Sequence, residues 1–276
     1  MNRGFWRLAL SAVLASAFLL VGAPASADPG PPPSSMASLG NSITQAFNSC
    51  GWYLDCPSRS WSTGDNTTVN SHYLRIRAKN PAINGNNHNN SESGGTISDL
   101  PGQADAAVSQ GVQYVTILMG ANDACTSSES TMTSVTTYRS HVNSALSKLK
   151  SGLPNARVFV ASIPDIKRLW FIGKDHWDAT SFWNSFDICQ SMLANPTSTA
   201  PEDEARRNRV RQRVIDFNTQ LAQACAAYGT NCKYDGNAVF NYQFMYSQVS
   251  GWDYFHPNTE GQRVLAQITY SAGFGW

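Results

Sequence analysis

Two short, unbroken runs of apolar and β-branched residues constrain the fold of this chain more than any other feature. They are "VQYVTILMG", Val112–Gly120, and "ARVFVASIP", Ala156–Pro164. Strands with one face in water alternate apolar and polar residues, whereas unbroken apolar strands are typical of parallel sheets covered by helices on both faces. A helical pattern separates the two runs, from about Ser130 to Leu149. This strand–helix–strand order predicts a doubly wound α/β sandwich.

The remaining elements extend this alternation toward both ends of the chain. The segment "SMASLG" predicts a first strand, followed by a short helix around Ser42–Asn48. A long helix is expected over residues 202–228, with Pro201 in its first turn and Gly229 as its stop. Near the C-terminus, "TEGQRVLAQITYSA" predicts a last helix.

Two segments need an interpretation of their own. The polar stretch "AINGNNHNNSESGG" lies where a second strand is expected, so it predicts an edge strand or an irregular loop, because a central strand would be apolar. The five arginines between Arg206 and Arg213 are interpreted as the solvated face of the long helix, held in helix-internal ion pairs. The alternative for the arginines is a binding patch.

The first 27 residues have the composition of a secretion signal. Arg3 and Arg7 precede the apolar run "LALSAVLASAFLLVG", and "APASA" ending at Ala27 offers a small-residue cleavage site. The apolar run is too short for a spanning helix, although a retained membrane anchor is the alternative. Residues 28–35 are a Pro-rich linker, and residues 36–276 form a single domain. We therefore expect a secreted protein without a transmembrane segment in the mature chain.

Charge and cysteine content narrow the partners and the chemistry. The formal net charge is +1 and no nucleic-acid motif is present, so a nucleic-acid partner is not expected. Six cysteines in an exported chain predict three disulfides, for which fifteen pairings exist. We favour Cys50–Cys56 and Cys225–Cys232 as small loops, which leaves Cys125–Cys189 as a long-range bridge. No cysteine or histidine spacing is that of a zinc site, so no metal is expected.

Four separate stretches carry residues suited to ester hydrolysis. Ser42 follows the first strand, "SESGGTISDL" supplies a glycine loop entering a helix, "GAND" places Asn122 after a buried strand, and "GWDYFHPN" holds Asp253 and His256. Ligand sites of doubly wound sheets form beyond the carboxyl ends of the strands. Taken singly, these residues are typical of helix caps and turns, so their joint occurrence carries the interpretation.

The chemistry assigns each of these residues a role. A serine hydroxyl is a weak nucleophile that needs a base, and His256 is the candidate base for Ser42. Asp253, three residues before His256, is expected to orient the imidazole and to stabilise its cation. The backbone N–H groups of Ser42 and Gly94 and the side chain of Asn122 are the expected oxyanion hole.

The four stretches resemble the ordered blocks of the SGNH (GDSL-type) hydrolase family. "LGNSIT" resembles its serine block, "SGGTISDL" its glycine block, "GAND" its G-x-N-D block and "DYFH" its D-x-x-H block. The resemblance implies a flavodoxin-like three-layer α/β/α sandwich with a mainly parallel, roughly five-stranded sheet, and ester hydrolysis without a cofactor. Asn41 departs from the aspartate usual in the family, Gly95 is the alternative to Gly94, and some members orient the histidine with a backbone carbonyl instead of the D-x-x-H carboxylate.

An aromatic segment, Asp165–Leu193, bears on the substrate. We interpret its apolar side chains as a wall that binds an acyl chain, the alternative being a subsidiary aromatic core under a long loop. These side chains are Leu169, Trp170, Phe171, Ile172, Trp177, Phe182, Trp183 and Phe186, of which Trp170, Phe171, Trp177 and Trp183 are the expected substrate-binding residues. "RSWSTGDN" and "GANDAC" resemble the bacterial phospholipase-like branch of the family. The expected substrates are therefore lipid acyl esters, cleaved by a phospholipase A/B-type or lipase activity of a monomer that contacts lipid surfaces transiently.

Two other functions are kept open. The first is a carbohydrate O-acetyl esterase with the same catalytic residues, for which the polar "NGNNHNNSES" segment would line a groove. The second is a non-catalytic glycan- or surface-binding protein of the same fold. That protein would not need Ser42, Asn122 and His256 to converge.

Overall fold

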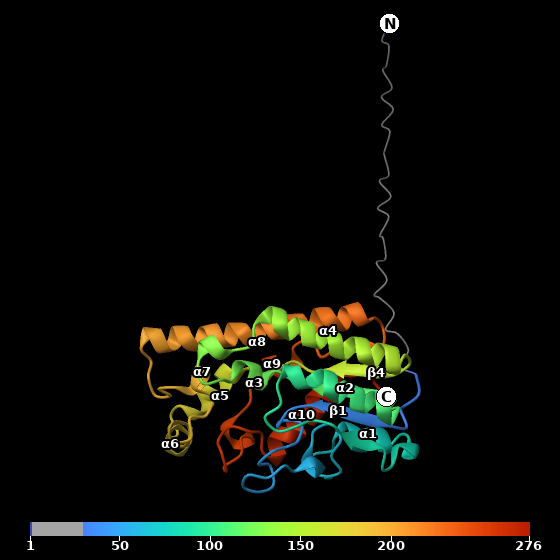
Figure 1. Cartoon of the computed structure of the whole chain (residues 1–276), viewed down its shortest axis with the longest axis horizontal. Coiled ribbons are helices and arrows are strands. Elements are labelled where there is room, and N and C mark those ends of the chain that lie inside the picture. Colours follow the sequence, from blue (N-terminus) through green and yellow to red (C-terminus); the bar gives the residue numbers. More distant parts are fainter. Residues whose placement is uncertain (2–29) are drawn as a thin grey trace.

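Five parallel strands form one sheet at the centre of the molecule (Figure 1). The computed structural model describes Met1 and residues 30–276, so the predicted secretion signal lies outside the described residues apart from Met1. The strand order is β2-β1-β3-β4-β5, and each neighbouring pair is parallel. The strands are β1 (Met36–Gly40), β2 (Asn87–Asn89), β3 (Tyr114–Leu118), β4 (Arg157–Val160) and β5 (Cys232–Tyr234).

Helices cover both faces of this sheet. Helices α2, α4 and α8 pack along one another on one face, while α1 and α10 lie on the other face (Figure 1). The strand order and the two helical layers are those of a flavodoxin-like three-layer sandwich, so the predicted fold class is confirmed. The α-helices are α1 (His72–Arg77), α2 (Leu100–Gln110), α3 (Ala121–Ala124), α4 (Val135–Gly152), α5 (Ile166–Gly173), α6 (Trp177–Ser185), α7 (Gln190–Leu193), α8 (Pro201–Tyr228), α9 (Ala238–Asn241) and α10 (Thr259–Ala272). Five 3₁₀ turns also occur within residues 30–276: η1 (Pro57–Arg59), η2 (Pro81–Ile83), η3 (Ile97–Asp99), η4 (Glu129–Thr131) and η5 (Tyr246–Gln248).

The burial of the strands follows from their composition. All five residues of β1 and of β3 are buried, as expected for central strands between two helical layers. The polar β2 lies at the edge, where its asparagine side chains bond to a neighbouring loop and to the adjacent strand β1 instead of packing in the core. Asn87 donates to the Thr63 carbonyl, and Asn89 accepts a hydrogen bond from the Ser38 hydroxyl. These asparagines are therefore part of the framework of the fold.

The expected short helix at residues 42–48 is wrong, because this segment is a series of turns. The Gln45 N–H donates to the Asn41 carbonyl in a helical pattern, but the next turn is irregular. Ala46 and Asn48 have φ values of 53° and 58°, a left-handed conformation that interrupts a right-handed helix. The Asn48 N–H then bonds to the Leu54 carbonyl across the Cys50–Cys56 loop.

The interpretation of the arginines on α8 holds only in part. Arg206 and Arg207 form ion pairs within the helix, with Asp203 and Glu204, whereas Arg209 and Arg211 pair with residues of other segments. Arg207 is fully buried, contrary to the expectation of a solvated face. Its guanidinium lies 4.2 Å from the centre of the Trp170 ring and donates to the Asn195 and Ser198 carbonyls. Arg207 therefore joins α8 to the segment that precedes it.

Three disulfides connect the six cysteines in the pairing favoured above, namely Cys50–Cys56, Cys125–Cys189 and Cys225–Cys232. The Cys125–Cys189 bridge joins the end of α3 to the start of α7, and its two cysteines are 64 positions apart in the sequence. None of the helices within residues 30–276 combines the length and apolarity needed to cross a bilayer.

Candidate active site

Ser42 lies at the carboxyl end of β1, where Gly40 permits a close approach of neighbouring backbone. A Cβ on Gly40 would lie 2.5 Å from the Leu118 carbonyl oxygen of β3, so a larger residue does not fit. The Gln103 side chain accepts from the Gly40 N–H at 2.7 Å and donates to the Gly40 carbonyl at 2.9 Å. This pair of hydrogen bonds from α2 fixes the backbone that precedes Ser42.

Asn41 stands where the family that the motifs resemble usually has aspartate, and it is fully buried beside Ser42. Its side-chain oxygen accepts from the Ile43 N–H at 3.1 Å and so shapes the turn after the strand. Its Nδ2 has no hydrogen-bond partner among the described residues. An unpartnered buried amide costs about 1–3 kcal/mol.

The side chains of Ser42, His256 and Asp253 form a continuous hydrogen-bonded chain. His256 Nε2 lies 2.8 Å from Ser42 Oγ, and His256 Nδ1 lies 2.6 Å from Asp253 Oδ2. An ionised carboxylate only accepts, so His256 donates from Nδ1 and its Nε2 accepts from the Ser42 hydroxyl. Phe47 and Phe255 pack edge-on against the imidazole at 5.1 and 5.0 Å, which further restricts its orientation.

Several donors hold the Asp253 carboxylate in place. Its Oδ1 accepts from the N–H groups of Phe255 and His256, and its Oδ2 also accepts from the Asn48 side chain at 2.7 Å. Burial by itself raises the pKa of Asp253, but the hydrogen bond and charge of His256 and the two backbone N–H groups outweigh it. The net effect is a pKa below the ordinary value, so the carboxylate remains ionised at neutral pH.

Three hydrogen-bond donors belong to residues that line one hollow together with His256. Ser42, Gly94, Asn122 and His256 line one small hollow. Among the described residues, the N–H groups of Ser42 and Gly94 have no acceptor, whereas the Gly95 N–H donates to the Glu92 carbonyl. The structure thus favours Gly94 over Gly95 as a free donor. Asn122 donates one amide hydrogen to the Gly95 carbonyl at 2.8 Å, which leaves its second amide hydrogen available.

Asp123 was not predicted as part of the site, yet it holds two site segments together. This buried carboxylate accepts from the Ile97 N–H at 2.9 Å and from the Thr133 hydroxyl at 2.8 Å. Burial raises its pKa, and these hydrogen bonds counter the effect only partly. Asp123 therefore ties the glycine loop to the turn that presents Asn122. Its position beside Asn122 in "GAND" was the one sequence signal that could have indicated this role.

A largely apolar cavity opens beside Ser42 and His256. The segment after β4, predicted to form an acyl-binding wall, contributes to this cavity through Leu169 and Ile172 of the predicted residues, but through none of its aromatic side chains. The lining side chains of that segment are Asp165, Ile166, Arg168, Leu169 and Ile172. The loop before α10 and the turns at residues 42–48, called the serine turn below, supply further lining residues, including Ile43, Phe244, Val249 and Phe255.

None of the four aromatic residues predicted to bind substrate lines this cavity. Trp170 and Trp183 are buried in the core, where Trp170 stacks on Arg207 and Trp183 donates to the Tyr254 carbonyl. Phe171 and Trp177 are exposed. The aromatic segment is also not a loop, because it contains α5, α6 and α7. The helix phase of α5 turns Ile166, Leu169 and Ile172 toward the cavity and Trp170 away from it.

Within residues 30–276, no three histidine, cysteine, aspartate or glutamate side chains are grouped as they would be around a metal ion. The polar groups that meet at Ser42 are instead a serine hydroxyl, an imidazole, a carboxylate that accepts from the imidazole and three hydrogen-bond donors. A serine, a histidine and a carboxylate linked in this order, at the carboxyl edge of a parallel sheet, suit ester hydrolysis.

The comparison with known families agrees with this class. The sequence profile of the GDSL-like Lipase/Acylhydrolase family matches residues 36–269. The chain belongs to this family and is an ester hydrolase of the GDSL type. The resemblance of the sequence motifs to the SGNH (GDSL-type) hydrolase family is thereby confirmed at the level of the family. No curated protein gives a significant match.

Solved structures match this chain at low sequence identity. A mutant of Axe2, an acetyl-xylooligosaccharide esterase from Geobacillus stearothermophilus, matches with a TM-score of 0.54 and 15% identity, over 90% of this chain and 97% of that chain. Phospholipase A1 from Streptomyces albidoflavus NA297 matches with a TM-score of 0.47 and 16% identity, over 87% and 99% of the two chains. An extracellular lipase from Streptomyces rimosus gives 0.45 and 16%, over 87% and 99%.

Proposed function

We propose that this chain is a secreted hydrolase of lipid acyl esters, with a phospholipase A/B-type or lipase activity, that uses Ser42, His256 and Asp253 in covalent catalysis. The observation that carries the lipid assignment is the apolar cavity beside Ser42. Apolar side chains from the serine turn, α5 and the loop before α10 suit an acyl chain, because they remove its methylene groups from water. An acetyl group would leave most of this surface without a partner.

The proposed reaction begins with attack of Ser42 Oγ on the ester carbonyl carbon. His256 Nε2 accepts the hydroxyl proton, and Asp253 stabilises the resulting imidazolium. The N–H groups of Ser42 and Gly94 and the Asn122 amide stabilise the oxyanion of the tetrahedral intermediate. As the intermediate collapses, the bond to the alcohol breaks and His256 returns the proton to the leaving oxygen. Water then attacks the acyl-enzyme with His256 as base, which releases the acid and restores Ser42.

The nucleophile assignment is tested with the Ser42→Ala variant on a soluble chromogenic ester such as p-nitrophenyl butyrate. We expect kcat to fall by about 10⁴-fold or more, because the covalent route is lost. A Ser49→Ala variant is the matched control, since Ser49 is also buried nearby but outside both hollows. Unchanged hydrolysis by the Ser42→Ala protein would contradict the assignment.

A substrate panel tests the lipid assignment. The panel compares p-nitrophenyl esters of increasing chain length, phosphatidylcholine in mixed micelles and acetylated xylan, with the Ser42→Ala protein as blank. We expect kcat/KM to increase from acetyl to longer chains and phosphatidylcholine to be cleaved. A strong preference for acetylated xylan would instead support the carbohydrate O-acetyl esterase.

A further inference from the structure

A patch of exposed aromatic side chains lies beside the site and takes no part in the chemistry described above. Its members are Trp52, Tyr53 and Leu54 of the Cys50–Cys56 loop, Phe182 and Phe186 of α6 and its C-terminal end, and Trp252 of the loop that carries Asp253. The Trp52 ring is the centre of this aromatic patch. It lies 5.9 Å from Phe182 and 6.5 Å from Trp252, measured between ring centres.

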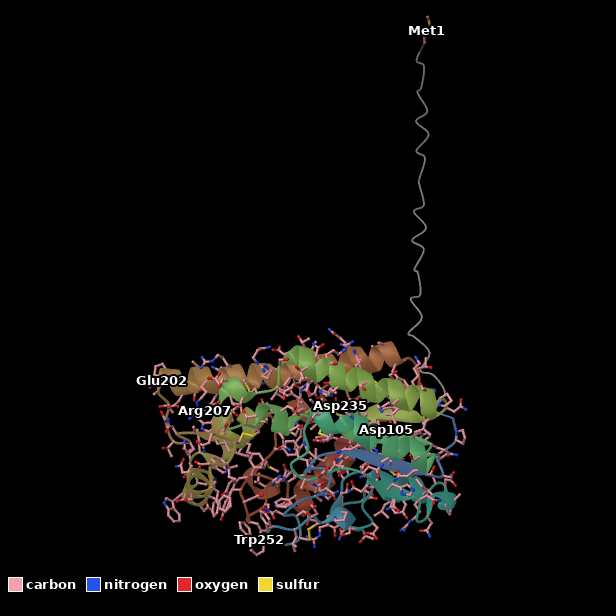
Figure 2. The ribbon with its side chains drawn as sticks, viewed as in Figure 1. Met1, Asp105, Glu202, Arg207, Asp235 and Trp252 are labelled. Carbon is pink, nitrogen blue, oxygen red and sulfur yellow. A yellow bond between two sulfur atoms is a disulfide. The ribbon has the colours of Figure 1, made fainter. Side chains whose placement is uncertain are left out.

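These apolar side chains are unusual in their exposure. Tyr53 is 75% exposed and Phe186 58%, and Trp52, Leu54 and Trp252 are each about half exposed. Soluble proteins rarely gather such side chains in one place without a partner for them. Figure 2 places Trp252 at the lower edge of the molecule, on the opposite side from Glu202 and Arg207 of α8.

The aromatic patch is joined to the active site by short contacts. Tyr53 lines the hollow that contains Ser42 and Gly94, and Phe47 packs between Tyr53 and the His256 ring. Trp183 of α6 donates to the Tyr254 carbonyl, two residues before His256. The Cys50–Cys56 bridge closes the loop that carries Trp52. A surface bound by the aromatic patch would therefore lie next to the mouth of the site.

The charges around the aromatic patch restrict the kind of surface that it can bind. Its three segments, residues 50–56, 182–187 and 250–254, contain Asp55, Asp187 and Asp253 but no lysine or arginine. Arg59, at the base of the first loop, is engaged by the Ser49 carbonyl and the Thr259 hydroxyl. Cationic groups that attract anionic headgroups are absent from these segments, so the partner is electrically neutral or zwitterionic.

From these observations we propose that the aromatic patch docks the enzyme on a zwitterionic phospholipid surface and holds the opening of the hollow at Ser42 against that surface. This inference rests on the lipid-ester function proposed above. Tryptophan and tyrosine are suited to the boundary between water and acyl chains, because their rings are apolar with one polar edge. Phe182, Phe186 and Leu54 supply apolar area without any hydrogen-bonding group.

The geometry of the rings favours a lipid surface over a polysaccharide. Sugar recognition needs hydrogen bonds to hydroxyl groups as well as ring contacts, and half of the members of the aromatic patch, namely Leu54, Phe182 and Phe186, offer no hydrogen-bonding group. The Trp52 ring is tilted by 49° from Trp252 and lies at 86° to Phe182, so these rings do not form a flat platform. A set of rings at different angles instead inserts between lipid molecules.

The test measures flotation of the inactive Ser42→Ala protein with vesicles of palmitoyl-oleoyl phosphatidylcholine. Adding Trp52→Ala and Trp252→Ala to this protein is expected to weaken vesicle partitioning more than tenfold. Trp177→Ala is the matched control, because Trp177 is 81% exposed but makes no ring contact with the aromatic patch. A separate Phe186→Ser variant is expected to weaken partitioning by a smaller factor. Binding should persist in 0.5 M NaCl and should not increase when phosphatidylglycerol is added.

Three results would overturn the docking proposal: no vesicle binding, equal partitioning of the Trp52/Trp252 variant and the control, or retention on insoluble acetylated xylan in place of vesicles. The active enzyme separates this proposal from the proposed function. The Trp52→Ala/Trp252→Ala enzyme should hydrolyse p-nitrophenyl butyrate within twofold of the unmodified rate but vesicle phosphatidylcholine more than tenfold more slowly. Patch-dependent binding without any phosphatidylcholine hydrolysis would overturn the substrate assignment alone.

Discussion

At the scale of single residues, the carboxylate of Asp253 has four hydrogen-bond donors within residues 30–276, and one of them is the imidazole of His256. The others are the Asn48 amide and the N–H groups of Phe255 and His256. This number of donors fixes the carboxylate rigidly, so the imidazole is oriented before a substrate arrives. Preorganisation of this kind makes catalytic hydrogen bonds effective.

The Asp253→Asn variant tests this orientation. We expect kcat on a soluble ester to fall by roughly 10³–10⁴-fold, because an amide cannot stabilise the imidazolium and can select the wrong tautomer. Asp187→Asn removes an exposed carboxylate from the same side of the molecule and should leave kcat unchanged. Near-full activity of the Asp253→Asn variant would mean that another group orients His256.

His72 provides a test of stability against pH. This buried imidazole bonds to the Tyr114 and Thr269 hydroxyls, and burial, with a smaller contribution from the charge of Arg75, lowers its pKa from 6.5 to about 3. Between these two pH values the unfolded chain binds a proton at this residue that the folded chain does not bind. The free energy of unfolding should therefore decrease as the pH falls from 6.5 toward 3, by on the order of 1 kcal/mol per pH unit.

The measurement is urea unfolding between pH 4 and pH 7. His72→Gln should flatten the dependence on pH even if it lowers stability at pH 7, because glutamine does not titrate. His141→Gln, on α4, is the control and should keep the slope of the unmodified protein. An unchanged slope in His72→Gln would show that other groups cause the acid sensitivity.

The sequence predicted that Ser42, Gly94, Asn122, Asp253 and His256 lie close together, because each belongs to a short local motif. It did not identify Asn48, whose contact with Asp253 spans 205 residues and depends on a left-handed turn. Gln103 is a comparable case, since a glutamine on a helix carries no local sign that it bonds to Gly40. Residues that support a site through tertiary contacts leave no periodic or adjacent pattern in the sequence.

At the scale of elements, one buried face of α8 was predicted from its apolar residues, whereas the burial of Arg207 on the same helix was not predicted. Val210, Val214, Phe217 and Leu221 are buried as their spacing predicts, and the helix spans Pro201–Tyr228. The burial of Arg207 was not predictable, because it depends on the carbonyl groups of residues 195 and 198 and on the Trp170 ring. Long elements with a strong apolar period were therefore predicted well, whereas the serine turn and the segment from α5 to α7 depended on tertiary packing.

We expect Arg207→Ala to lower the free energy of unfolding by about 3 kcal/mol, because it removes a fully buried guanidinium that bonds to two carbonyl groups, pairs with Glu204 and stacks on Trp170. Arg209→Ala is the control on the same helix. Its side chain is 59% exposed and pairs with Glu129, so its removal should cost less than 1 kcal/mol, the usual range for exposed ion pairs. Urea unfolding of both variants measures the difference, and similar losses would contradict the structural role of Arg207.

At the scale of the whole molecule, the disulfides constrain the chain to different extents. Bridges that close longer loops remove more conformational entropy from the unfolded chain. Cys125–Cys189 spans 64 residues and Cys225–Cys232 spans 7. Replacing the first pair by serine should lower the free energy of unfolding by about 4 kcal/mol, and replacing the second by about 2–3 kcal/mol. Denaturant unfolding of the two double variants measures both losses of stability. A larger loss on replacing Cys225 and Cys232 than on replacing Cys125 and Cys189 would contradict the prediction.

The hydrogen bond between His256 and Ser42 joins positions that are 214 residues apart. Ribosomes make the base and its carboxylate partner more than 200 residues after the nucleophile. Under the proposed mechanism, a nascent or truncated chain that lacks the segment with Asp253 and His256 cannot cleave an ester, whatever part of the sheet has already formed. Catalytic competence thus begins with the docking of this segment, and activity on a soluble ester reports that the segment has been made and has folded against the turn that carries Ser42.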